Sequence, residues 1–324
     1  MWEFVAILAG IAFISFIPVL LWGYLFAYID DTPVWNTRFL AGVFGWILAV
    51  IPVLYIDQIA KLTWLDYLNS FSLLSNISSI VSSASFGASL VLWVLCIALF
   101  SLLSVTVFHG WLSVSRVYLK NIFIFVLFIA GISFLFYLIH LLFQAFPVFD
   151  VQTNSTIGWV VNSSLKFIIF YYIVVWVIEE SAKHFNFLQS SLAAINNYKV
   201  WVLYAIFVAL GFSFTENMLY LYSEYSHSWF GEDFLKIYFF RSIFSVIVHV
   251  LASSLIGYYF SKAYLNHRKN KLIFPYIKVF LLWIFWWVIL HSLFDIWLTL
   301  WFSLIIILYF LWGYFYVTSL LYRE

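Results

Sequence analysis

Long apolar runs recur along the whole chain, and they constrain its fold more than any other feature. The 324 residues are 66% hydrophobic and only 9% charged, whereas soluble domains are roughly 25% charged. About 20 mostly apolar residues suffice to cross a bilayer as a helix. Because lipid cannot hydrogen-bond an exposed backbone, helices and closed barrels are the only spanning structures. The sequence therefore predicts an all-α, polytopic membrane helix bundle.

The apolar runs predict about nine transmembrane helices, with eight as the alternative count. A less apolar, serine-rich stretch at 58–87 favours an extramembrane loop with an interfacial or re-entrant piece. The predicted spans lie near residues 4–28, 39–56, 88–112, 121–146, 160–190, 200–223, 237–261, 276–299 and 302–321.

The basic residues indicate how these spans are oriented. If the N-terminus is outside, most of the 15 Lys and Arg residues fall in cytoplasmic connections. The cluster at 262–278 contributes most to this bias. Since cytoplasmic loops carry an excess of Lys and Arg, we expect an outside N-terminus and a cytoplasmic C-terminus.

Composition also excludes several classes of partner and site. A net charge of +1 gives no basic surface for nucleic acid, so the lipid bilayer is the expected environment. The single cysteine, Cys96, excludes an internal disulfide and a cysteine-based metal cluster.

Ionisable residues within the predicted spans concentrate in the second half of the chain. Charges at membrane depth are costly and usually functional. We therefore divide the chain into an N-terminal scaffold of about four helices at 1–157, a motif-bearing core at 158–300 and a C-terminal transmembrane helix at 301–324. The core carries Glu179, Glu180, Lys183, His184, Glu216, Arg241, His249, His291 and Asp295.

The pair Glu179-Glu180 is the centre of this pattern. On a helix, Lys183 is a neighbour of both carboxylates, at i+4 and i+3. Such a group suggests different roles for the two carboxylates: the lysine holds one of them ionised, and the other serves acid–base chemistry. The alternative is a helix end at the interface, where charged side chains are solvated.

Three later spans each supply further polar groups. Glu216 and Asn217 follow an apolar stretch, and Arg241, Ser245 and His249 share one helical stripe. In the eighth span, Asp295 lies four residues after His291 and can orient its ring. The alternatives are a helix-end carboxylate, a polar helix–helix interface and a structural His–Asp pair.

Together these groups favour hydrolysis of a buried bond. Carboxylates and imidazoles could activate a water and hold an oxyanion, or ligate a divalent metal that activates the water. The chain contains neither HExxH nor GxSxG.

The ordered motifs resemble those of a known family. Glu179-Glu180-x-x-Lys183, Phe212-x-x-x-Glu216-Asn217, His249 with Gly257, and His291-x-x-x-Asp295 resemble the four motifs of the PrsW-type intramembrane proteases. That family looks like a branch of the superfamily of the type II CAAX prenyl endopeptidases and bacteriocin-processing proteases. The superfamily also contains the non-catalytic scaffold subunit of γ-secretase. The resemblance covers about residues 165–300.

The resemblance implies a glutamate-dependent endopeptidase of the bacterial cell membrane that cuts a membrane-anchored protein or peptide. Its implied catalytic residues are Glu179 as general base, Glu180 as a shared or structural carboxylate, Glu216 and His249 at the water, and His291 and Asp295 at the scissile carbonyl. Lys183, Asn217 and Arg241 would support them. No cofactor is expected, although a divalent metal remains open. Asp295 stands where relatives often have Asn and donates a hydrogen bond only if protonated.

Two other classes of function remain as alternatives. One is a non-catalytic membrane scaffold of the same superfamily, which would keep the polar cluster for helix packing. The other is an ion- or proton-coupled transporter, since buried Glu and His chains also relay protons. The chain lacks the internal repeat expected of many transporters.

Overall fold

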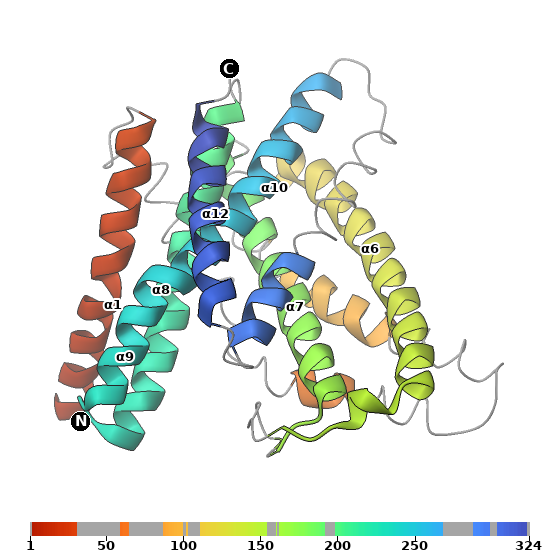
Figure 1. Cartoon of the computed structure of the whole chain (residues 1–324). Coiled ribbons are helices and arrows are strands. Elements are labelled where there is room, and N and C mark those ends of the chain that lie inside the picture. Colours follow the sequence, from red (N-terminus) through yellow and green to blue (C-terminus); the bar gives the residue numbers. More distant parts are fainter. Residues whose placement is uncertain are drawn as a thin grey trace. The chain divides into compact units, whose positions relative to one another are not determined.

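The computed structural model describes residues 2–30, 59–64, 87–99, 102, 111–153, 160, 162–191, 198–267, 288–298 and 303–322. Within these ranges the chain is almost entirely helical (Figure 1). The only extended pairing described there is an isolated antiparallel bridge between Gln152 and Ser164. The prediction of an all-α helix bundle is confirmed.

The described chain consists of seven named α-helices and two irregular turns. A 3-10 turn, η1, follows α6, and a π-helical turn, η2, joins α9 to α10. The bounds are α1 (Trp2–Ile29), α6 (Trp111–Ala145), η1 (Pro147–Asp150), α7 (Leu165–Ser191), α8 (Tyr198–Ser228), α9 (Glu232–Phe240), η2 (Arg241–Ser245), α10 (Val246–His267) and α12 (Ser303–Leu321). Two shorter apolar helices are Gly87–Leu99 and Val288–Leu298.

Five of the described helices are long and apolar enough to cross a membrane. They match predicted spans and establish an integral membrane protein. α7 is 27 residues long, but it carries Lys166, Glu179, Glu180 and Lys183 and is therefore not among them. The five spans are Phe4–Ile29, Asn121–Ala145, Tyr198–Ser226, Glu232–Ala263 and Leu304–Leu321.

The predicted spans differ from the observed helices at several ends. The prediction at 39–56 lies outside the described residues, and those at 88–112 and 276–299 are described only in part. Trp111 begins α6 and does not end the preceding span. With 35 residues, α6 is about 52 Å long at 1.5 Å per residue, so it exceeds a hydrocarbon core of about 30 Å. The added turns include Arg116 and Lys120, which lower the hydropathy of this segment.

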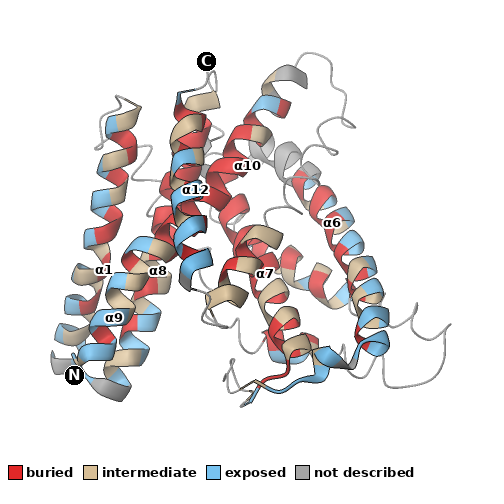
Figure 2. Ribbon diagram, viewed as in Figure 1, coloured by how far each residue is buried: buried red, intermediate tan, exposed pale blue. Residues whose placement is uncertain are grey.

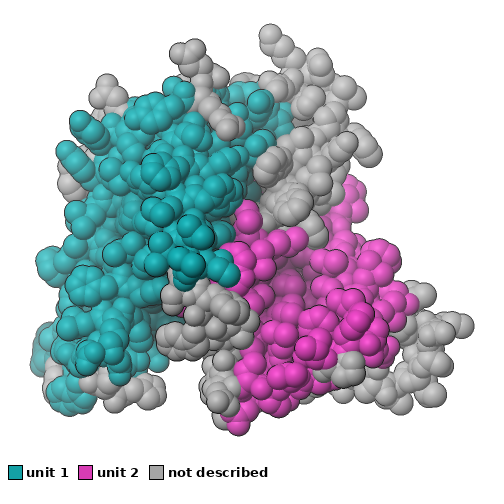
Figure 3. All heavy atoms as spheres, viewed as in Figure 1, with its two compact units in different colours: residues 1–50, 186–283, 303–324 teal, residues 51–185, 284–302 magenta. Residues whose placement is uncertain are grey.

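The chain divides into two compact units (Figure 3). Unit 1 comprises residues 1–50, 186–283 and 303–324, and unit 2 comprises residues 51–185 and 284–302.

In unit 1, α8 is the central helix and packs against α1, α9 and α10. Every residue from 201 to 213 of α8 is buried (Figure 2). α10 approaches α8 closely at Gly257, where an added Cβ would lie 2.8 Å from the Ala205 Cβ and 3.0 Å from the Trp201 carbonyl oxygen. The glycine predicted on the His249 stripe therefore sets the separation of these two helices.

In unit 2, α6 and α7 meet through aromatic side chains. The rings of Phe136 and Phe170 lie 5.4 Å apart, and those of Phe125 and Phe185 lie 5.1 Å apart. All residues of α7 from 174 to 185 are buried. The helix thus carries its charged segment through the protein interior, and its end at Ser191 lies well beyond the carboxylate pair.

Candidate functional site

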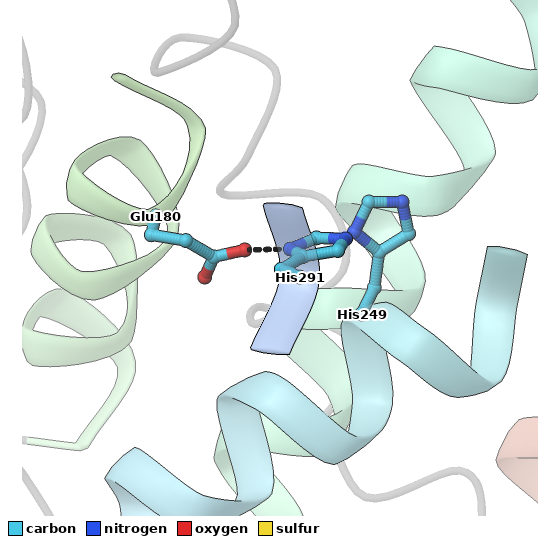
Figure 4. A group of neighbouring side chains, drawn as sticks. All are labelled: Glu180, His249 and His291. Carbon is cyan, nitrogen blue, oxygen red and sulfur yellow. Dashed lines mark hydrogen bonds and ion pairs between the residues drawn. The ribbon is translucent and has the colours of Figure 1, made fainter. Parts of the chain in front are cut away.

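Glu180 is the hub of a buried polar cluster in unit 2. Its Oε1 accepts a hydrogen bond from Nδ1 of His291 at 2.9 Å, as Figure 4 shows for these two side chains. The same oxygen pairs with the Lys183 ammonium one turn along α7. All three residues are no more than 2% exposed. Removing one partner of a buried ion pair leaves an uncompensated charge. The stability of this cluster therefore depends on all of its charged members together.

Trp176 encloses this cluster from the preceding turn of α7. Its ring lies against the His291 imidazole, and the Lys183 ammonium lies 5.7 Å from the ring centroid. An ammonium over an indole face is attracted by the ring quadrupole. The indole therefore supports the cation that Glu180 also binds.

The other acidic and imidazole groups of unit 2 occupy neighbouring turns. Glu179 is 5% exposed, so the helix-end alternative does not describe the carboxylate pair. Asp295 lies one turn after His291 and is half-buried. His184 is buried, and its Nε2 lies 3.0 Å from Oδ1 of Asn121, which links α7 to α6.

A second, partly buried polar cluster lies within unit 1. Oε2 of Glu216 lies 2.7 Å from Nε2 of His249 and 2.8 Å from Nη2 of Arg241. The Arg241 Nε donates a hydrogen bond to Oδ1 of Asn217 at 3.0 Å. Glu216 lies 12 residues before the last residue of α8, Ser228, and is therefore an interior residue of the helix. Unit 1 thus brings together four of the residues expected at the site.

The π-helical turn η2 presents Arg241 to α8. The Val246 N–H bonds to the Arg241 carbonyl, five residues back, and thereby widens the helix. The Arg241 guanidinium lies 3.8 Å from the Tyr220 ring centroid, and Ser245 Oγ lies 3.4 Å from Nε2 of His249. The predicted stripe of Arg241, Ser245 and His249 is therefore present. Single π turns inside helices often accompany functional sites.

Comparison with known proteins identifies the family. Residues 119–321 match the model of the PrsW-protease family, which is described as PrsW family intramembrane metalloprotease. The chain belongs to the PrsW family. A relative named Protease PrsW from Clostridioides difficile (strain 630) is 36% identical over 70 residues, which are 22% of this chain and 27% of the relative. No solved structure matches.

The PrsW match extends beyond the motifs on which the resemblance rested. It begins at residue 119 and so includes most of α6 as well as α12. It leaves out α1, although α1 packs on α8 within unit 1.

The description of the PrsW family as metalloproteases raises the question of whether these residues fit a metal. Ligating imidazoles usually direct their second ring nitrogen at a carboxylate. His291 does so through Nδ1 to Glu180, and His249 does so through Nε2 to Glu216. Imidazole and carboxylate are also the ligands that zinc accepts. The donor chemistry of both clusters therefore fits a divalent ion.

Sequence reasoning did not find the aromatic residues of the two clusters. Trp176 precedes Glu180 by four residues and Tyr220 follows Glu216 by four. Neighbours at i±4 share a helical face, so this spacing was the available signal. In a chain with 17 Trp and 22 Tyr, the signal does not distinguish these two from packing residues.

Proposed function

We propose that the protein is an intramembrane endopeptidase that hydrolyses a peptide bond of a membrane-anchored protein or peptide with a glutamate-activated water. Membership of the PrsW family supports the class of reaction. The observation that carries the proposal is the buried hydrogen bond between His291 and Glu180 beside Lys183. This contact supplies an oriented imidazole next to two buried carboxylates of α7.

The two adjacent glutamates have different roles in this proposal. Glu180 already binds Lys183 and His291 through one oxygen, so it serves as the anchored, structural carboxylate. Glu179 is the general base. It takes a proton from water, the water oxygen bonds to the scissile carbonyl carbon, and the carbonyl oxygen gains the electron pair. Glu179 then returns the proton to the amide nitrogen as the carbon–nitrogen bond breaks.

The remaining motif residues act on the water and on the carbonyl. His249 and Glu216 complete the water site, and His291 donates to the carbonyl oxygen together with Asp295, whose carboxyl must be protonated to do so. Since Nδ1 of His291 bonds to Glu180, donation from Nε2 requires a doubly protonated ring, whose charge Glu180 would offset. Arg241, Asn217 and Lys183 hold the carboxylates in place.

A metal-activated water is the second candidate, and the family description favours it. In unit 2, His291 and Glu180 are the residues that would hold the ion. A bound divalent ion would lower the pKa of a ligated water and polarise the carbonyl. Glu180 would orient the His291 ring through its Nδ1.

The proposal also includes the cellular location of the protein, its orientation in the membrane and the roles of its three segments. It assigns the protein to the bacterial cell membrane, with the N-terminus outside and the C-terminus cytoplasmic. It also treats residues 1–157 as scaffold, residues 158–300 as the protease-like core and residues 301–324 as a C-terminal anchor.

The test does not require a known substrate. Cells would express the wild type, Glu179→Gln, Glu180→Gln or, as a control, Glu232→Gln, which alters an exposed carboxylate paired with Lys236. Mass spectrometry of protein N-termini in the membrane fraction should reveal new ends in the wild type and in the control. Both site variants should lack these ends at equal protein levels. Identical sets of N-termini in all four strains would refute the peptidase.

Metal analysis of the same purified proteins separates the two ways of activating water. A water activated by glutamate alone predicts cleavage that survives chelation and a wild-type protein without stoichiometric metal. A bound ion predicts loss of cleavage on chelation, recovery with added Zn²⁺, and reduced metal content in His291→Ala.

A further inference from the structure

Trp22 connects the N-terminal helix to the π-helical turn of unit 1. Its indole Nε1 donates a hydrogen bond to the backbone carbonyl of Ser242 at 2.9 Å, across 220 residues of sequence. Ser242 is the second residue of η2 and follows Arg241 directly. α1 therefore contacts the turn that presents Arg241 to Glu216.

The π-helical turn needs such an outside donor. In an α-helix each carbonyl accepts from the N–H four residues on, so that the hydrogen-bond ladder is complete. A π turn shifts the bonds to five residues and interrupts that ladder. A carbonyl displaced in this way requires another partner when it is buried. Trp22 provides one for Ser242.

Aromatic packing fixes the indole in this position. The Trp22 ring stacks on Phe26 with centroids 5.9 Å apart, and it contacts Phe310 and Tyr314 of α12 at 6.4 and 6.2 Å. Phe244 of η2 packs on Phe310 at 5.2 Å. Tryptophans that only anchor a span lie at the membrane interface with their N–H in the polar layer. This one bonds to protein backbone within an aromatic cluster.

We propose that Trp22 is a positioning residue, through which α1 holds η2 in the π conformation and thereby aims Arg241 at Glu216. The inference rests on the proposed peptidase function for its catalytic consequence. It gives α1 a role at the site, although α1 lies outside the region that matches the family model. Arg241 in turn holds Glu216 beside His249.

The test uses Trp22→Phe, which keeps an aromatic ring but loses the N–H donor together with part of the indole. Tyr24→Phe is the matched control, because Tyr24 lies on the same helix and is 62% exposed. The substrate is the membrane protein whose cleavage required Glu180 in the preceding experiment. We expect Trp22→Phe to lower kcat about fivefold to tenfold with KM unchanged, since the loss corresponds to one hydrogen bond. Tyr24→Phe should retain the wild-type rate.

A double-mutant comparison shows whether Trp22 affects kcat through Arg241. In an Arg241→Lys background, which keeps the charge but loses the planar fork, Trp22→Phe should reduce kcat by less than twofold. If the double variant lowers kcat by the product of the two single-variant factors, the inference is overturned, because Trp22 would then act through another group. A wild-type rate for Trp22→Phe would overturn it as well, while the peptidase function would stand.

Hydrogen–deuterium exchange gives a result that does not depend on activity. Trp22→Phe should speed amide exchange in peptides covering η2, and Tyr24→Phe should not. If the wild type cuts no protein, the proposed function fails, and this measurement alone decides the link between α1 and η2. Unchanged exchange in η2 would then overturn it.

Discussion

Replacing Lys183 by methionine tests whether the unit 2 cluster depends on charge compensation. Lys183 is 1% exposed and Glu180 is 2% exposed, so the substitution leaves a buried carboxylate without its ammonium partner. Breaking a buried pair costs about 3–5 kcal/mol. His291 still donates to Glu180, which favours the lower end, about 3 kcal/mol. Methionine suits the test because its unbranched thioether can still pack on Trp176.

The decisive comparison is a double-mutant cycle with Glu180→Gln. That single variant leaves the Lys183 ammonium buried and should cost a similar amount, whereas Glu180→Gln/Lys183→Met leaves no buried charge. We therefore expect the double variant to be more stable than the sum of the single effects predicts, by about 2 kcal/mol or more. Unfolding of the detergent-solubilised protein, followed by near-UV circular dichroism, provides the measurement. Strictly additive losses would refute charge compensation as the basis of the pair.

Two further predictions concern helix packing. Gly257→Ala should lower stability by about 1–3 kcal/mol, because the new methyl group meets Ala205 and the Trp201 backbone. Gly131→Ala is the control, since no atom lies within 4 Å of its added Cβ, and an equal loss in both variants would contradict the prediction. Asn121→Leu should cost about 1–3 kcal/mol by leaving the His184 N–H buried without its acceptor. Adding His184→Phe should recover part of this loss in the same unfolding assay, and no recovery would show that the hydrogen bond is not the cause.

Hydropathy predicted the helical membrane architecture because the bilayer leaves a chain few alternatives. It placed the spans that became α1, α8 and α12 within a few residues of their ends. It could not place the start of α6, since the added turns of α6 contain Arg116 and Lys120.

The candidate site was predictable where its contacts are local. The ion pair of Glu180 and Lys183 follows from their i,i+3 spacing. The hydrogen bond from His291 to Glu180 spans 111 residues and depends on how the helices pack. No periodicity in a single sequence contains that information. The sequence identified the candidate residues, and the tertiary structure determines which of them are in contact.

The π-helical turn was not predictable from the residues that form it. Arg241, Ser245 and His249 follow α-helical spacing, and nothing in the segment marks an interrupted ladder. The donor that the interrupted ladder needs comes from α1, far away in sequence. The α-helical spacing therefore correctly predicted that these three residues share one face, although the backbone there forms a π-helical turn.

The formal charges of the unit 2 cluster argue for a specific proton transfer between its residues. Glu180 and Lys183 cancel each other, and the proposed mechanism keeps Asp295 protonated and neutral, which leaves Glu179 and His291 to balance. The group is neutral when the Glu179 carboxyl is protonated and the His291 ring is neutral. It is equally neutral when Glu179 is ionised and the ring is doubly protonated. The two states differ by one proton moved inside the cluster, so neither adds net charge to a site where charge is costly. In the proposed mechanism, only the second state offers both a base for water and a donor for the carbonyl oxygen. A neutral glutamine at Glu179 should therefore remove the base and also weaken the double protonation of His291, which ¹⁵N NMR of the histidine rings can detect.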